Sequence, residues 1–323
     1  MRTKDLHILP KMRDGWSYLY VEHCRVDRGD KAILVHDERG KVQVPVASLA
    51  VLMLGPGTAI THAAISTLAD NGCLALWTGE QGVRMYAQGM GETRSSLPLL
   101  QQARLWAHPK LHLDVVIRMY QMRFSEPLDP SLTLRQIRGK EGIRVREAYA
   151  QASRATEVKW EGRNYNRQSW DVADPINRAL SAANSTLYGI CHAAIVSAGY
   201  SPALGFVHTG KQLSFVYDVA DLYKTEFSIP VAFEETAHGD AHLETRVRYG
   251  LRDLFTERRL LQRIVPDLQR LMALPEWAEK QGIDFDADMA APGGLWDSVM
   301  GEVSGGVNFS FSEEASIDDD LDS

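Results

Sequence analysis

The chain has 323 residues, 45% of them hydrophobic and 24% charged, a composition typical of a globular protein of about two domains. A formal net charge of −7 argues against nucleic-acid binding, but that charge is uneven. Residues 276–323 hold 13 acidic side chains and one basic side chain, a net of −12. The other 275 residues hold 34 basic and 29 acidic groups, a net of +5, so the body is mildly basic. Only a clustered positive face on this body would matter for DNA.

The first residues of the chain carry no targeting signal. The segment from Met1 to Trp16 is charged and lacks an apolar signal core. The most apolar run, Leu49 to Leu54, stops at Gly55 and is far short of the ~20 residues that a membrane-spanning helix needs. The three cysteines are far apart and form no metal or disulfide pattern. The sequence therefore predicts a cytoplasmic protein without a membrane partner.

Residues 1–90 are predicted to form a small β-rich domain. Alternating and β-branched patterns predict strands at residues 18–23, 32–36, 42–46, 51–54, 73–77 and 83–87. One helix is expected between Thr61, a capping residue, and Gly72. The polar segment 91–98 contains Gly and Ser and is expected to be a linker.

Residues 99–275 are predicted to form a larger, all-α domain, so the expected fold class is α+β. Apolar residues at helical spacing predict helices at residues 99–122, 134–153, 175–198, 215–223 and 245–273, the last broken only at Pro266. Residues 276–323 form an acidic tail without clear periodicity, which we expect to be flexible.

The first segment that suggests chemistry runs from Arg135 to Arg146. It holds five basic side chains around one carboxylate, Glu141. One interpretation is a salt-bridged surface helix. The other is a site in which the cations hold phosphates and Glu141 binds a metal. Both need the same residue types, so the spacing does not separate them.

The second segment runs from Gly205 to Lys224. Ser214 is a candidate cap for a helix on which Asp218 and Asp221, three residues apart, share one face. With the imidazole of His208, these carboxylates suit Mg²⁺ or Mn²⁺. The structural alternative is that both carboxylates pair with Lys211 and Lys224.

The motifs in these segments resemble the CRISPR-associated integrase family Cas1, and in particular its type I-E branch. They are Gly139-Lys-Glu-Gly-Ile-Arg-Val-Arg, Asp174-Pro-Ile-Asn and Gly205-Phe-Val-His-Thr-Gly-Lys, which leads into Ser214-Phe-Val-Tyr-Asp-Val-Ala-Asp. The similarity extends from about residue 16 to residue 274 and includes a β-rich N-terminal domain joined to a larger helical domain. It leaves the acidic tail uncovered.

The resemblance implies a site and its ligands. Glu141, His208 and Asp221 correspond to metal ligands of the family, with Asp218 as the adjacent catalytic carboxylate. The cofactor would be Mg²⁺ or Mn²⁺. Side chains that would contact DNA are Arg84, Arg138, Arg146, Tyr165, Tyr188, Lys211, Tyr217 and Arg248. The branch stacks a tyrosine on the end of the duplex. Here that position is His23, and Tyr20 is the alternative.

The resemblance also implies partners and an activity. The protein would form homodimers, two of them bridged by a dimer of the small protein Cas2. It would join the 3′-hydroxyls of a captured double-stranded DNA fragment with 3′ overhangs to the repeat edges of CRISPR leader-repeat DNA, by transesterification, as a metal-dependent endonuclease and integrase. The alternatives are a general metal nuclease and a non-catalytic DNA-binding scaffold. The tail either keeps the basic body from unspecific DNA or docks through Val307, Phe309 and Phe311.

Overall fold

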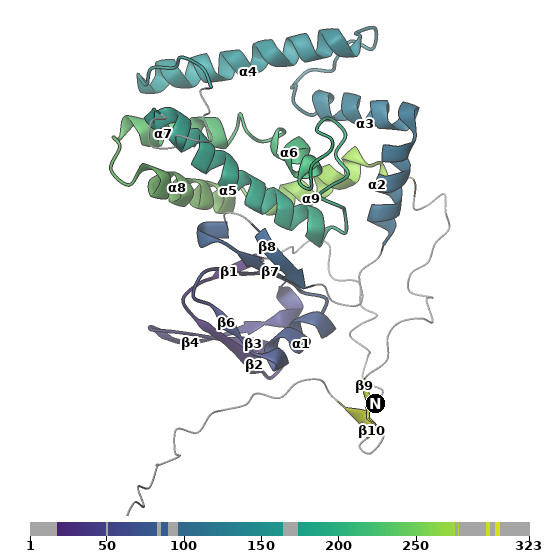
Figure 1. Ribbon diagram of the computed structural model, residues 1–323, viewed down its shortest axis with the longest axis vertical. Helices are drawn as coiled ribbons and strands as arrows, with labels where there is room; N and C mark the ends of the chain where they lie inside the picture. The colour runs from purple at the N-terminus through teal and green to yellow at the C-terminus, as the bar shows by residue number, and fades with distance from the viewer. Residues whose placement is uncertain are drawn as a thin grey trace, which may run out of the picture.

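The computed structural model describes residues 18–49, 51–82, 85–89, 96–163, 174–274, 277, 295–297 and 301–303. A β-rich part lies below a larger helical part (Figure 1). One four-stranded sheet has the order β1-β5-β7-β8 and the other has the order β4-β3-β2-β6. The strands are β1 (Tyr18–Val21), β2 (Arg25–Gly29), β3 (Ala32–Asp37), β4 (Gly40–Pro45), β5 (Val51–Leu54), β6 (Ala59–Ile60), β7 (Leu74–Thr78) and β8 (Met85–Gly89).

The sheet built on β5 and β7 is covered on both faces. Strands β1, β5 and β7 run parallel, and β8 pairs with β7 in the antiparallel sense. Leu52 and Leu54 face a core that they share with the second sheet and with helix α1 (His62–Asp70), which the Thr61 side chain caps. Val51 and Met53 point the other way and pack against the helical part. Burial on both faces explains why these short strands are continuously apolar.

The helical part is organised around α5 (Pro175–Ser197), most of whose side chains are buried. Its Ala193 and Val196 contact the sheet, so one helix joins the two parts of the molecule. By length and composition α5 could cross a membrane, but 78% of its apolar window is buried inside the protein, as in a core helix. The other helices are α2 (Leu97–Ala107), α3 (Pro109–Gln121), α4 (Leu134–Thr156), α6 (Ser214–Ala220), α7 (Ser228–Ala237), α8 (Leu243–Glu257) and α9 (Leu260–Leu271).

This architecture confirms the α+β fold and corrects several predicted elements. The helix expected over 99–122 is two helices, because His108 precedes a proline and takes an extended conformation. The helix expected over 245–273 breaks at Arg259, which has a left-handed backbone, and not at Pro266. Strands β2 and β6 and helix α7 were not predicted. In α7, Pro230 lies in the first turn, where a helix does not use its N–H.

Two remaining predictions concern segments of which the structure describes little or nothing. Most of the 91–98 linker lies outside the described residues, and α2 already begins at Leu97. In the acidic tail, β9 (Leu295–Asp297) pairs with β10 (Gly301–Val303) in an antiparallel hairpin. Val307, Phe309 and Phe311 lie outside the described residues.

Candidate functional site

Glu141 lies on α4, the long helix drawn across the top of Figure 1. A capping box formed by Thr133 and Gln136 fixes the start of this helix. The Glu141 carboxylate is one of only two buried side chains among the described residues of α4, and two arginines hold it. Arg144 Nε is 2.7 Å from Oε2, and Arg123 Nη1 is 3.2 Å from Oε1. The basic residues around Glu141 therefore include a direct ion-pair partner.

Arg123 also reaches the second predicted carboxylate. Its Nη2 lies 3.8 Å from Oδ2 of Asp221, the residue that ends α6. One guanidinium thus spans Glu141 and Asp221, which are far apart in the sequence. Sequence reasoning missed Arg123 because it follows the end of α3 and belongs to no motif. On the other side of Asp221, Lys224 Nζ is 2.6 Å from Oδ1, as the structural alternative anticipated for this pair.

His208 is oriented by Asp218 from within α6. Asp218 is fully buried, and its carboxylate accepts hydrogen bonds from the backbone N–H groups of residues 206, 207 and 208. His208 Nδ1 lies 2.7 Å from Asp218 Oδ1. That hydrogen bond raises the pKa of His208 against the effect of burial, and the nearby Asp221 raises it further. A carboxylate bonded to Nδ1 leaves Nε2 available for a ligand. Asp218 thus fixes the ring, and no Asp218–Lys211 pair is found among the described residues.

Ser214, expected to cap α6, does not cap it. It is the first residue inside the helix, and Leu213 occupies the capping position without a side-chain bond. The Ser214 hydroxyl instead accepts a hydrogen bond from Lys211 N at 3.0 Å. This bond closes the turn that follows His208.

Two predicted DNA-contacting aromatics lie beside this site. The Tyr188 and Tyr217 rings are 5.0 Å apart at their centroids in an edge-to-face arrangement, and Tyr217 is also edge-on to His208 at 5.9 Å. Lys224 Nζ lies 5.1 Å from the Tyr188 ring centroid. Burial opposes the charge of Lys224, but Asp221 and Tyr188 together raise the pKa of this lysine. Tyr217 therefore lies next to His208, Tyr188 lies next to Tyr217, and Lys224 lies over the ring of Tyr188.

Glu141, Asp221 and His208 offer the types of ligand that a divalent cation prefers. Two carboxylates and one imidazole fit Mg²⁺ or Mn²⁺, and the ring-orienting carboxylate is a common feature of metal-bound histidines. Among the described residues, however, no three acidic, His or Cys side chains are close enough to enclose an ion. Arg123 and Lys224 supply the positive charge next to the carboxylates. Two nitrogens of Arg123, Nε and Nη2, are buried without a hydrogen-bond acceptor, so its own contacts are incomplete.

The other predicted DNA contacts are dispersed. Arg138, Arg146 and Lys211 are exposed, the two arginines on α4 and the lysine after His208. Arg248 on α8 is 3.2 Å from Glu80 and so connects the helical part to the β-rich part. Arg84 and Tyr165 lie outside the described residues.

The two candidates for the duplex end differ in exposure. His23 is exposed, with a left-handed backbone whose N–H donates to Pro56 O. Tyr20 is half-buried, and its hydroxyl donates to Glu22 at 2.7 Å. His23 is therefore the more accessible of the two rings.

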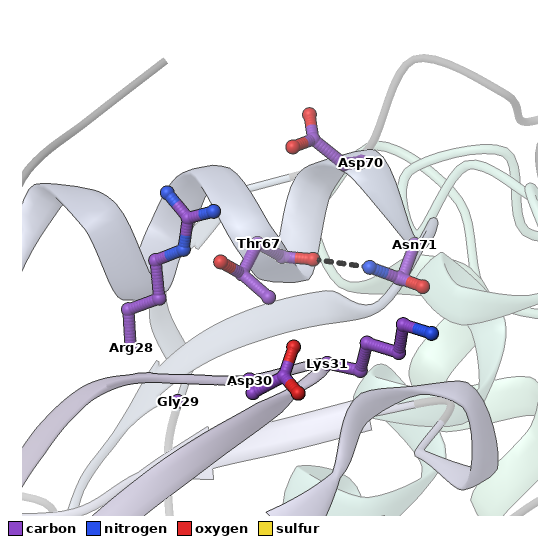
Figure 2. Close-up of a pocket in the computed structure, with 7 residues that line it drawn as sticks. All are labelled: Arg28, Gly29, Asp30, Lys31, Thr67, Asp70 and Asn71. Atoms are coloured by element: carbon purple, nitrogen blue, oxygen red, sulfur yellow. Dashed lines mark hydrogen bonds between the residues drawn. The ribbon is translucent and has the colours of Figure 1, made fainter. Parts of the chain in front are cut away.

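A polar pocket of about 530 Å³ lies in the β-rich part, away from these residues. Figure 2 shows it between the β2–β3 turn and the end of α1, where Asn71 Nδ2 donates to Thr67 O at 2.8 Å. Its charged lining is mixed, with two basic and two acidic side chains: Arg28, Lys31, Asp30 and Asp70. This balance favours neither an anion nor a cation.

Comparison with known proteins gives consistent matches. The family model described as "CRISPR associated protein Cas1" matches residues 120–240. The chain is 56% identical to "CRISPR-associated endonuclease Cas1 2" of Thermus thermophilus, over 95% of this chain and 94% of that protein. It is 42% identical to "CRISPR-associated endonuclease Cas1" of a Clostridium species, over 95% of this chain and all of the relative. A solved structure, "Crystal structure of TtCas1-DNA complex", superposes with a TM-score of 0.74 at 57% identity, over 82% of this chain and 99% of that one.

Proposed function

The chain belongs to the CRISPR-associated Cas1 family, and on that basis we propose that it is a metal-dependent DNA endonuclease and integrase of spacer acquisition. The observation that carries this proposal is the convergence of Glu141 and Asp221 on Arg123, next to a histidine that Asp218 orients. The name of the Thermus relative and the DNA in the similar solved structure support an enzyme that acts on DNA.

The proposed reaction is a transesterification at a repeat edge. The 3′-hydroxyl of a captured fragment loses its proton and its oxygen bonds to phosphorus, while the original P–O3′ bond breaks and the leaving oxygen takes up a proton, so protons balance. Glu141, Asp221 and neutral His208 would hold Mg²⁺ or Mn²⁺. When bound, such an ion lowers the pKa of the attacking hydroxyl and neutralises charge on the phosphate oxygens.

The protein side chains supply the remaining functions. Lys224 and Arg144 add fixed positive charge near the carboxylates. Asp218 keeps the His208 ring in one orientation. Tyr188 and Tyr217 offer faces on which unpaired bases of a 3′ overhang stack. No protein nucleophile is required, because the attacking group belongs to the DNA.

The proposed assembly is that of the family. A homodimer would bind the DNA fragment, and a dimer of Cas2 would bridge two such homodimers on the leader-repeat DNA. Two sites held at a fixed distance would then set the length of the inserted DNA. We place the reaction in the cytoplasm, where free cysteines such as the buried Cys24, Cys73 and Cys191 remain reduced.

One set of observations favours a second candidate, a non-catalytic DNA-binding scaffold. Arg123 and Lys224 already pair with the two carboxylates, so these pairs could be purely structural. Joining of a labelled fragment to a repeat-containing plasmid, with Mg²⁺, Mn²⁺ or EDTA, separates the candidates. An integrase joins strands with metal, and Glu141→Gln abolishes joining. A general nuclease only cuts, and a scaffold binds DNA and does neither.

A further inference from the structure

The segment 201–208, which we call the histidine loop, leads from the end of α5 to His208 and is held from two sides. Asp218 binds three of its N–H groups from one side, as described above. Four of its carbonyl oxygens, those of residues 201, 204, 205 and 206, contact the corner between α2 and α3. Three side chains from that corner contact them: Gln102, Trp106 and His112.

Gln102 forms hydrogen bonds to the first half of the histidine loop. Its Nε2 donates to the carbonyls of Ser201 and Leu204, each at 3.0 Å, and its Oε1 accepts from Ser201 N at 2.8 Å. The Gln102 side chain is fully buried, so its amide has no water to replace these partners. It thus fixes the turn that follows α5.

Trp106 and His112 contact backbone carbonyls in the second half of the histidine loop. Trp106 Nε1 donates to Gly205 O at 3.1 Å. The His112 ring bridges two backbone segments, with Nε2 2.9 Å from Phe206 O and Nδ1 3.1 Å from Trp106 O. These contacts end two residues before His208.

The loop is also tightly closed at Gly205. A Cβ at that position would lie 2.2 Å from His208 O and 2.7 Å from two atoms of Ser214. Because only glycine fits, the backbone around His208 has little room to adjust. The carbonyls and amides of one short segment are therefore fixed by α2 and α3 on one side and by α6 on the other.

We infer that Gln102, Trp106 and His112, the loop clamp, are positioning residues that act through His208. They hold the histidine loop in place, and with it the ring that Asp218 orients. This inference rests on the proposed function. It adds three residues that occur in none of the motifs and that join α2 and α3 to the chemistry.

The chain offers a matched control for the test. Gln101 precedes Gln102 on α2, is equally buried, and donates from Nε2 to a different carbonyl, Met272 O, at 2.9 Å. Gln101→Leu removes this bond and the one that Gln101 Oε1 accepts from Arg104 at 3.2 Å, whereas Gln102→Leu removes three bonds. Both variants therefore remove a buried amide, and only that of Gln102 contacts the loop. Trp106→Phe is the mild variant, because it keeps an aromatic ring and removes the N–H.

Three measurements on the full-length protein test the inference: strand joining at saturating DNA, DNA affinity, and Mn²⁺ binding without DNA. The EPR signal of the free ion reports Mn²⁺ binding. We expect Gln102→Leu and Trp106→Phe to weaken Mn²⁺ binding and slow joining by about tenfold, since loss of a group that orients a ligand typically costs 10–100-fold. DNA affinity should stay within about twofold, and Gln101→Leu should match wild type in Mn²⁺ binding.

The inference is overturned if Gln101→Leu loses as much Mn²⁺ affinity as Gln102→Leu, or if Trp106→Phe loses none. Should the wild-type protein join no strands, the proposed function fails independently. Hydrogen exchange of peptides covering 201–208 then decides the inference. Faster exchange in Gln102→Leu and Trp106→Phe than in Gln101→Leu supports the clamp, and equal rates refute it.

Discussion

Asp218 determines the orientation of the His208 ring. Asp218 accepts from three backbone N–H groups and lies 2.7 Å from His208 Nδ1, so its carboxylate is fully engaged inside the protein. The same burial that makes the aspartate unavailable to solvent makes it a rigid support. The two aspartates therefore have different partners: Asp218 holds the ring of His208, and Asp221 at the end of α6 pairs with Arg123 and Lys224.

We predict that His208→Ala abolishes strand joining and leaves DNA affinity within about threefold of wild type, because lysine and arginine side chains, and not a neutral imidazole, neutralise phosphates. Joining assays and DNA titrations on one preparation check this. His62→Ala, which removes an exposed histidine of α1 in the β-rich part, is the control. Joining by His208→Ala at a rate near wild type would remove this histidine from the site.

His192, a buried histidine outside the site, is expected to make the free energy of unfolding depend on pH. Burial lowers the pKa of His192 on α5 to about 4, from 6.5. Between these values the unfolded chain binds a proton that the folded chain does not, so stability falls as the pH falls. We expect a slope of about 1.4 kcal/mol per pH unit from this group. Urea unfolding at pH 7, 6 and 5 should show a smaller decline for His192→Gln, whereas His62→Gln, at an exposed position, should follow wild type.

Several site residues could be predicted from the sequence and several could not. Glu141, His208 and Asp218 belong to recognisable motifs. In the structure, Glu141 and Asp221 both contact the guanidinium of Arg123. Arg123 and Gln102 have no such signal, because their importance depends on tertiary contacts to residues distant in sequence. Their side-chain types are also common on ordinary helices.

At the scale of elements, α4 carries Glu141 although little of the helix is buried. Ile137 and Glu141 are its only buried side chains among the described residues, so packing contributes little to its start. The capping box supplies local stability there: Gln136 N donates to Thr133 Oγ1, and Thr133 N donates to Gln136 Oε1 at 2.9 Å. The position of the carboxylate thus depends partly on two exposed residues.

We predict that Thr133→Ala lowers the free energy of unfolding by about 1 kcal/mol, the usual effect of losing such a cap. Thr133→Ser, which keeps the hydroxyl, should stay close to wild type. Chemical denaturation measures both variants, and strand joining well below the melting temperature should be unchanged in each. An Ala variant as stable as wild type would show that packing alone fixes the start of α4.

Elements were predicted best where one local signal decides them. The capped helix α1 and the hairpin of β3 and β4 follow from their own residues. The breaks at His108 and Arg259 were missed because the apolar spacing continues across them. The expected break at Pro266 is wrong. Helix α9 continues through this proline, because buried neighbours such as Val265 and Leu268 hold the helix in place.

At the scale of the whole molecule, charge is divided between the body and the tail. The body carries a net of +5 and the last 48 residues carry −12, so the average hides a mildly basic body. Arg248 is one of the cations of this body and pairs with Glu80 across the two parts of the protein. The same arginine can therefore serve the interface between these parts or a phosphate.

We predict that DNA binding is salt-sensitive and that Arg248→Gln weakens binding to any sequence, reducing the slope of log K against log salt by about 1. Fluorescence anisotropy from 50 to about 300 mM salt measures the slope. Arg39→Gln, at a strongly exposed position on the β3–β4 turn, is the matched control. An affinity independent of salt would exclude phosphate contacts as the main source of binding.

The central place of α5 has a consequence for how the protein is made. This apolar helix leaves the ribosome before α7, α8 and α9, which cover it in the folded chain. About 70 residues separate the end of α5 from the end of α9, and at about 5–20 residues per second their synthesis takes on the order of 4 to 15 s. During that interval the nascent chain exposes a segment with the length and hydropathy of a membrane span. We therefore expect chaperones to bind it before α7, α8 and α9 cover it.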